Sequence, residues 1–125
     1  MRKRLSDRER QLRAILERDW QRTVIAAAHL HGFKVYATRQ SGKTLADGTY
    51  ATIIDADGKG FPDLVCTHPE RKVKLFIENK REGEKTTPDQ DAWLEWLSDP
   101  PRSRCWVLWP HDADELDQVF GKETA

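Results

Sequence analysis

The stretch GFPDLVCTHPERKVKLFIENK, residues 60–80, decides the fold of this chain. It holds two runs rich in apolar and β-branched residues, 63–66 and 73–78, with a proline-containing turn signal between them. Two such runs joined by a short turn predict an antiparallel β-hairpin. Asp63 opens the first run and Glu78 closes the second, so we expect the hairpin to bring these two carboxylates close together.

The second strand of this hairpin changes from apolar to polar at its end. Residues 75–77 are all apolar, which in a strand indicates burial on both faces. Side chains two apart in a strand point to the same face, so Glu78 and Lys80 are expected to project together while Asn79 points away. The charged pair therefore lies at the rim of a core, a position typical of a functional site.

The residue types at this rim suit a hard divalent cation. Mg²⁺ takes oxygen ligands and usually keeps several waters, so two carboxylates and a backbone carbonyl form a candidate site for Mg²⁺ or Mn²⁺. Asp63, Glu78 and the Asn79 carbonyl are the candidate ligands. A lysine beside such an ion orients or deprotonates a water and stabilises charge on a phosphate. With Lys80 next to the acids, the pattern predicts phosphodiester hydrolysis.

The length of the chain indicates a single domain, and its net charge is neutral. We expect residues 1–125 to form one domain, with a basic N-terminal segment 1–10, a core 11–110 and a short acidic C-terminal helix 111–125. Lys plus Arg equals Asp plus Glu at 21 each, so the net charge gives no argument for a polyanionic partner. Local basic clusters, one of them after Lys80, permit a basic face but equally serve to solvate a small protein.

The composition argues against several other classes of protein. Cys66 and Cys105 are too few and too far apart to indicate a disulfide framework or a zinc site, so we expect buried free thiols. The basic N-terminus leads into Arg- and Glu-rich sequence, so neither a signal peptide nor a membrane span is expected. The histidines have no spacing typical of a metal site or a catalytic dyad. We expect a cytoplasmic protein, in the host cytoplasm if a phage encodes it.

A long helix is predicted before the hairpin. Residues 6–9 have the spacing of a capping box, and Gly32 indicates a helix C-terminus. An apolar stripe for packing on a sheet recurs at helical spacing: Leu12, Leu16, Trp20, Val24, Ala27 and Leu30. Glu17 and Gln21 share a face with apolar residues further along, so both are expected to look inward.

Strands and further helices are indicated in the rest of the chain. The strands are expected at 33–38, 49–55 and 104–109 in addition to the hairpin, and the loop 39–48 has no clear pattern. The loop contains Lys43, a candidate contact to a ligand.

The second helix has a strong start signal. Thr87 is its expected cap, Pro88 its first residue and Gln90 the third residue of a capping box. Its expected core stripe is Trp93, Leu94, Trp96 and Leu97. A short terminal helix is expected at 112–120, with an aspartate cap.

The order of these residues resembles the PD-(D/E)XK nucleases and, within them, the VRR-NUC family. The resemblance spans residues 17–110 and is carried by Glu17, Gln21, Gly60-Phe61-Pro62-Asp63, Phe76-Ile77-Glu78, Lys80, Gln90 and Trp93. It implies an α/β fold with a restriction-endonuclease-like αβββαβ core, in which helices flank a central mixed four-stranded sheet.

The resemblance also implies a role for each site residue. Asp63 and Glu78 correspond to metal ligands, and Lys80 corresponds to the catalytic lysine. Glu17 corresponds to a direct or outer metal ligand, and Gln90 to a residue that positions the site. Many relatives carry an apolar residue between the second acid and the lysine, where this chain has asparagine, but only the backbone carbonyl of that position is used.

Structural roles compete with these functional ones. Glu17 also has the spacing of an exposed ion pair with Arg13, and Gln90 also serves as the capping partner of Thr87. The five tryptophans suit base stacking, as on single-strand binding platforms, but most follow the apolar pattern of a core.

The resulting hypothesis is a DNA endonuclease that depends on Mg²⁺ or Mn²⁺ and needs no small-molecule cofactor. We expect Lys43, Arg81 and Lys85 to contact the nucleic acid, and selection by DNA shape, such as a Holliday junction or a flap. A homodimer is expected, because two symmetric sites cut two strands. Two alternatives stay open: a catalytically silent DNA-binding module, and an accessory subunit of a larger phage or mobile-element complex.

Overall fold

The structure is a computed structural model that describes residues 6–38, 41–44, 50–53 and 56–122, with the backbone alone for 9–15, 17, 41–44 and 50–53. The helices are α1 (Asp7–Leu30), α2 (Pro88–Leu97) and α3 (Leu116–Phe120), with a 3-10 helix η1 (Pro110–Glu115) before α3. The strands are β1 (Lys34–Ala37), β2 (Ser41–Thr44), β3 (Tyr50–Ile53), β4 (Leu64–Thr67), β5 (Lys74–Asn79) and β6 (Ser103–Leu108).

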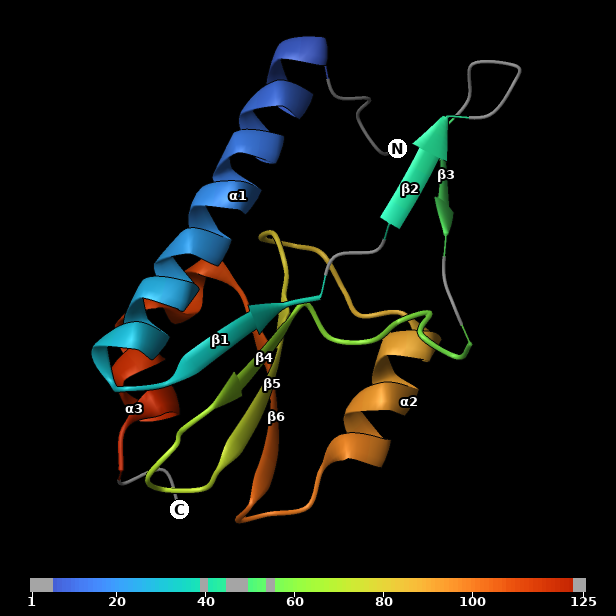
Figure 1. Cartoon of the computed structure of the whole chain (residues 1–125). Helices are drawn as coiled ribbons and strands as arrows, with labels where there is room; N and C mark the ends of the chain where they lie inside the picture. Colours follow the sequence, from blue (N-terminus) through green and yellow to red (C-terminus); the bar gives the residue numbers. More distant parts are fainter. Residues whose placement is uncertain (1–5, 39–40, 45–49, 54–55, 123–125) are drawn as a thin grey trace.

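A mixed four-stranded sheet forms the centre of the molecule, with strand order β1-β4-β5-β6 (Figure 1). The β1–β4 and β4–β5 pairs are antiparallel, whereas β5 and β6 are parallel because α2 connects them as a crossover. The predicted hairpin is confirmed as the β4–β5 pair. The predicted α/β fold, with helices around a mixed four-stranded sheet, is confirmed as well.

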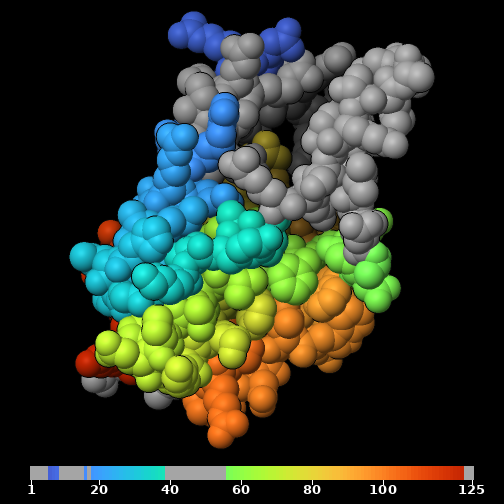
Figure 2. All heavy atoms as spheres, in the orientation of Figure 1, coloured from blue at the N-terminus to red at the C-terminus, as the bar shows by residue number. Residues whose placement is uncertain are grey.

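The two faces of β5 pack against different helices. Leu75 and Ile77 belong to the main core, together with residues of α1 and α3. Phe76 points to the opposite face, where its ring contacts Phe61, whose ring in turn contacts Trp93 of α2. Figure 2 shows the segment that contains Phe61, in green, lying directly against α2, in orange. Burial of β5 on both faces explains its continuous apolar run.

Helix α1 follows its predicted bounds but buries a narrower stripe than expected. Trp20, Val24 and Ala28, spaced four residues apart, are buried in the core. The prediction was wrong for Leu16 and Leu30, which are 62% and 80% exposed. The N-terminal half of α1, to which Leu16 belongs, extends beyond the central sheet (Figure 1), and Leu30 lies about 200° around the helix from Ala28.

The predicted strand at 49–55 exists as β3 but does not join the central sheet. It pairs antiparallel with β2, which lies within the loop 39–48, for which the sequence predicted no structure. The two strands form a separate two-stranded sheet (Figure 1). A β-branched run indicates extended backbone but not the partner strand, so the sequence could not place this hairpin.

Helix α2 has the predicted capping box but not the predicted core stripe. Trp96 is 68% exposed, and no residue of α2 is fully buried. The ring of Trp96 rests edge-on against Trp93, at the outer end of the aromatic contacts that start at Phe76. Trp93, Leu94 and Leu97 are half-buried, so α2 covers its face of the sheet without a fully buried side chain.

The C-terminal segment begins earlier than predicted and is not one helix. The 3-10 helix η1 precedes α3, whose Leu116, Val119 and Phe120 are buried in the core. Of the two free thiols, Cys66 is buried, which raises its pKa to about 12, and Cys105 is half-buried. Within the described residues, no helix is long and apolar enough to cross a membrane.

Candidate active site

The two acids of the hairpin lie side by side, as predicted. Leu64 pairs with Ile77 in the antiparallel register, which places Asp63 opposite Glu78 at the open end of the hairpin. The backbone N–H of Asn79 donates a hydrogen bond of 2.9 Å to Oδ2 of Asp63. Two carboxylates from neighbouring strands therefore meet at one edge of the sheet.

The backbone before Asp63 is held from two sides. The Thr38 hydroxyl donates to the carbonyls of Pro62 and Asp63, and the Thr38 N–H donates to the Asp63 carbonyl at 2.8 Å. Gly60 has a φ of +86°, and a Cβ there would lie 2.6 Å from the backbone carbonyl carbon of Asp89. Only glycine lets this segment run so close to the start of α2, and that approach fixes the position of Asp63.

Glu78 is a buried carboxylate, only 3% exposed. Its Oε1 accepts a hydrogen bond of 2.8 Å from Nε2 of Gln90, whereas Oε2 has no partner within the described part of the chain. Burial and then the negative charge of Asp63 raise the pKa of Glu78 to about 7, against the opposing effect of the Lys80 ammonium. A buried, half-satisfied carboxylate beside a second acid is a place where a cation is favoured.

Lys80 points to the same face as Glu78 and is also buried. Its Nζ lies 3.6 Å from Glu78 Oε1 and 3.4 Å from Oε1 of Glu84. Its backbone N–H donates to the Leu108 carbonyl at 2.9 Å, which ties the end of β5 to β6. The Lys80 ammonium therefore lies between the carboxylates of Glu78 and Glu84.

Sequence reasoning missed Glu84, which bridges two cations. Its Oε2 accepts hydrogen bonds of 2.9 and 2.6 Å from Nε and Nη2 of Arg81. Its backbone carbonyl accepts a hydrogen bond of 2.7 Å from the indole of Trp109. Burial alone would raise the pKa of Glu84, but the hydrogen bond from Arg81 and the charges of Arg81 and Lys80 lower it. Its spacing of four from Lys80 was the available signal, but outside a helix that spacing predicts no contact.

Gln90 completes the capping box of α2 and also contacts Glu78. Its Oε1 accepts a hydrogen bond of 2.9 Å from the Thr87 N–H, and its backbone N–H donates to the Thr87 hydroxyl, which completes the capping box. Its Nε2 is left to bind Glu78. One side chain thus joins the start of α2 to the acid of β5.

The remaining predicted residues lie at different places around the site. The Asn79 side chain points away from Glu78 and is buried, and its amide has no hydrogen-bond partner in the described part of the structure. Lys85 is exposed in the segment after β5. Glu17 lies on α1 and Lys43 on β2, but their side chains are outside the described residues. Gln21, expected to look inward, is half-buried.

Comparison with known proteins identifies the family of the chain. A family model of the VRR-NUC domain matches residues 7–103 of the chain. A solved structure described as a VRR_NUC domain is 23% identical, with a TM-score of 0.53 over 82% of this chain and 94% of that one. That likeness concerns the fold alone, and no curated protein matches the sequence. From the family match over most of its length, the chain belongs to the VRR-NUC family of the PD-(D/E)XK nuclease superfamily, and its function is of the nuclease type.

Proposed function

We propose that this protein is an endonuclease that hydrolyses DNA phosphodiester bonds with Mg²⁺ or Mn²⁺. The observation that carries the proposal is the juxtaposition of Asp63, Glu78 and Lys80 at one edge of the sheet. These three side chains suit hydrolysis of a phosphodiester, which needs a site for a hard cation and a positively charged group beside it.

The donor set fits a divalent cation. Oε2 of Glu78 is buried and has no hydrogen-bond partner among the described residues, and the negative charge of Asp63 raises the pKa of Glu78, an effect that a bound cation would relieve. The described residues contain no group of three or more His, Cys, Asp or Glu side chains placed for a metal. Waters and the Asn79 carbonyl would therefore complete the shell, and we propose Glu17 as a further ligand from α1.

Each residue then has a defined task. A bound Mg²⁺ or Mn²⁺ supplies Lewis acidity toward the phosphate and lowers the pKa of a coordinated water. Asp63 and Glu78 hold the ion, and Gln90 fixes the orientation of Glu78 through its 2.8 Å hydrogen bond. The Lys80 ammonium, 3.6 Å from Glu78, orients the attacking water or stabilises negative charge on the phosphate.

We propose DNA with a branch, a flap or a Holliday junction as the substrate. The cations beside the site, Arg81 and Lys85, suit phosphate oxygens, which carry no sequence information. Discrimination would then depend on DNA shape and deformability. We also propose a homodimer, in which two symmetric sites cut two strands; light scattering of the purified protein, together with the number of cuts per junction, tests it.

The direct test is cleavage of a panel of labelled DNAs. Purified protein is incubated with four-way junction, flap and linear duplex in Mg²⁺, Mn²⁺ or EDTA. Cleavage in either metal and none in EDTA supports the proposal, and the DNA that is cut fastest identifies the substrate class. Binding without cleavage in every metal would instead favour a silent DNA-binding module or an accessory subunit.

Replacement of Gln90 by methionine is expected to lower cleavage about 10- to 100-fold. Methionine fills a similar volume but cannot donate to Glu78, and loss of a group that orients a metal ligand typically has an effect of this size. Thr87→Ala is the matched control, because it breaks the other half of the capping box and costs about 1 kcal/mol of stability. Equal losses of activity in the two variants would mean that Gln90 acts through the capping box of α2 and not through its hydrogen bond to Glu78.

Lys85→Gln is expected to weaken DNA binding about equally for every DNA in the panel. An exposed lysine that contacts a phosphate contributes about one unit to the slope of log affinity against log salt. Lys74→Gln is the control, because Lys74 is exposed at the opposite end of β5. Binding titrations at several salt concentrations measure the affinity and its salt dependence for both variants. If Lys85→Gln left the slope of log affinity against log salt unchanged, Lys85 would not contact the DNA.

A further inference from the structure

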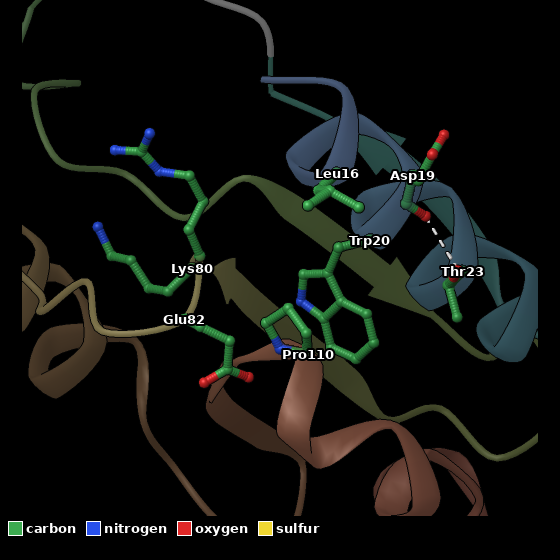
Figure 3. Close-up of a pocket in the computed structure, with 8 residues that line it drawn as sticks. Leu16, Asp19, Trp20, Thr23, Lys80, Glu82 and Pro110 are labelled. Atoms are coloured by element: carbon green, nitrogen blue, oxygen red, sulfur yellow. Dashed lines mark hydrogen bonds between the residues drawn. The ribbon is translucent and has the colours of Figure 1, made fainter. Parts of the chain in front are cut away.

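A pocket of about 390 Å³ lies between α1 and the segment that follows β5 (Figure 3). Its first wall consists of Leu16, Asp19, Trp20 and Thr23 of α1, and its second wall of residues 80–82 and Pro110. Apart from Lys80 and Arg81, none of these residues has a part in the function proposed above. A hollow of this size falls within the range of small-ligand sites.

The pocket lies next to the candidate active site. Lys80 directly follows β5, and Pro110 comes two residues after the end of β6. These two strands are parallel, so the pocket opens beyond their carboxyl ends, which is where ligands bind in such sheets. Lys80 lines the pocket and also contacts Glu78. Figure 3 shows its side chain pointing away from Trp20, so the two sites lie on either side of one short segment.

The surface of the pocket is mainly apolar. Leu16 is a large aliphatic side chain that is 62% exposed. The indole N–H of Trp20 donates to the Leu108 carbonyl at 3.1 Å, so Trp20 offers the pocket an apolar surface. The Thr23 hydroxyl donates to the backbone carbonyl of Asp19, and the Asp19 carboxylate is exposed on the same helix. The apolar walls suit the face of a flat heterocycle.

The distribution of charge indicates on which side of the site a DNA strand would lie. α2 carries Asp89, Asp91 and Glu95 and no basic residue, so its surface repels phosphate. Arg81 and Lys85 lie instead on the segment that forms the second wall of the pocket or directly follows it, together with exposed Glu82 and with Glu84, which pairs with Arg81. A strand held by these cations would run past the pocket rather than along α2.

We propose that this pocket receives one unpaired nucleobase of the DNA, next to the phosphate that is cut. The proposal rests on the proposed function and narrows its substrate class. Bases in a duplex are stacked and paired, and extrusion costs a few kcal/mol, least for a base that is already unpaired. The preferred substrate is therefore a flap or another DNA with an unpaired nucleotide at the cut, rather than linear duplex or a fully paired four-way junction.

Leu16→Gln tests the pocket without disturbing the core. Leu16 is exposed, and glutamine keeps the helix propensity while it removes the apolar wall. Leu30→Gln is the matched control, since Leu30 is exposed on the same helix and does not line the pocket. Equal melting temperatures for both variants and the unchanged protein would show that neither change acts through folding.

The cleavage measurement compares flap DNA with a fully paired duplex of the same sequence. The ratio of the two rates is expected to favour the flap and to fall about tenfold in Leu16→Gln, which corresponds to the loss of one base contact. Leu30→Gln should keep the ratio of the unchanged protein. A ratio that is the same in both variants overturns the proposal while the nuclease function stands.

The binding measurement needs no catalysis and therefore separates the two proposals. Flap DNA with 2-aminopurine at its first unpaired position is bound in EDTA, and quenching of its fluorescence by acrylamide is measured. A base enclosed by the pocket is protected from acrylamide in the unchanged protein and in Leu30→Gln, but not in Leu16→Gln. Absence of protection in the unchanged protein would refute the proposal that the pocket binds a nucleobase. Protection without cleavage of any DNA would refute the proposed hydrolysis and support the pocket.

Discussion

Replacement of Lys80 by methionine is expected to lower the rate of DNA cleavage about a thousandfold. The size follows from the loss of a positioned group that transfers or stabilises charge, which is typically worth 10²- to 10⁴-fold. Methionine has nearly the length of the lysine stem, so the buried segment between Glu78 and Glu84 stays filled. Single-turnover cleavage of the preferred DNA measures the effect, with DNA affinity followed in parallel.

Lys80→Arg distinguishes the two tasks open to this residue. Arginine keeps a positive charge but does not lose its proton at accessible pH, so it can stabilise a phosphate but cannot act as a base. Partial activity of the arginine variant would assign Lys80 to charge stabilisation, and loss equal to that of methionine would favour positioning or proton transfer by the amine. Retention of more than about a tenth of the activity by the methionine variant would contradict any catalytic role.

Glu78→Gln is expected to have two effects of opposite sign. It should abolish cleavage and the stabilisation by Mg²⁺ or Mn²⁺, because it removes one of the two proposed carboxylate ligands. In the metal-free protein it should raise stability at pH 8, because glutamine removes a buried negative charge beside Asp63 and leaves an acceptor for Gln90. Thermal unfolding with and without metal measures both effects.

The pH dependence of this difference follows from the pKa of Glu78. Its value of about 7 in the folded state lies above the ordinary 4.5, so the folded state binds the proton more tightly. The metal-free protein therefore loses stability as the pH rises from 4.5 to 7, by up to about 3 kcal/mol at about 1.4 kcal/mol per pKa unit. The advantage of Glu78→Gln should be small at pH 5 and full at pH 8.

Glu70→Gln is the control for this experiment, because Glu70 is exposed in the turn of the same hairpin. It should show neither the gain in stability at pH 8 nor the loss of stabilisation by metal. If Mg²⁺ stabilised Glu78→Gln as much as the unchanged protein, Glu78 would not be a ligand. A stability difference between the two proteins that did not change with pH would contradict the raised pKa.

Local patterns were sufficient to predict the centre of the site. The pairing of Asp63 with Glu78 follows from two strands and a short turn, and the shared face of Glu78 and Lys80 follows from the two-residue period of a strand. The capping box of α2 likewise depends only on neighbouring residues. Each of these features is encoded within a few positions of the chain, so no tertiary information is needed.

Features that depend on how distant elements meet were not predictable in the same way. Leu16 has the spacing of a core residue but is 62% exposed, and Trp96 of α2 contacts the ring of Trp93 but is 68% exposed. The contact between Gln90 and Glu78 depends on the docking of α2 on β5. Glu84 binds Lys80 through a turn that has no periodic signal. The sequence pattern determines the elements, whereas these contacts depend on their lengths and packing.

The most direct test of the central claim is a titration of Mn²⁺ into the metal-free protein and into Asp63→Asn, followed by electron paramagnetic resonance. The account predicts that the unchanged protein binds Mn²⁺ and that Asp63→Asn, which keeps the volume but removes the charge, loses this binding. Mg²⁺ should displace the bound Mn²⁺. Equal binding of Mn²⁺ by the two proteins would contradict a metal site built on Asp63 and Glu78.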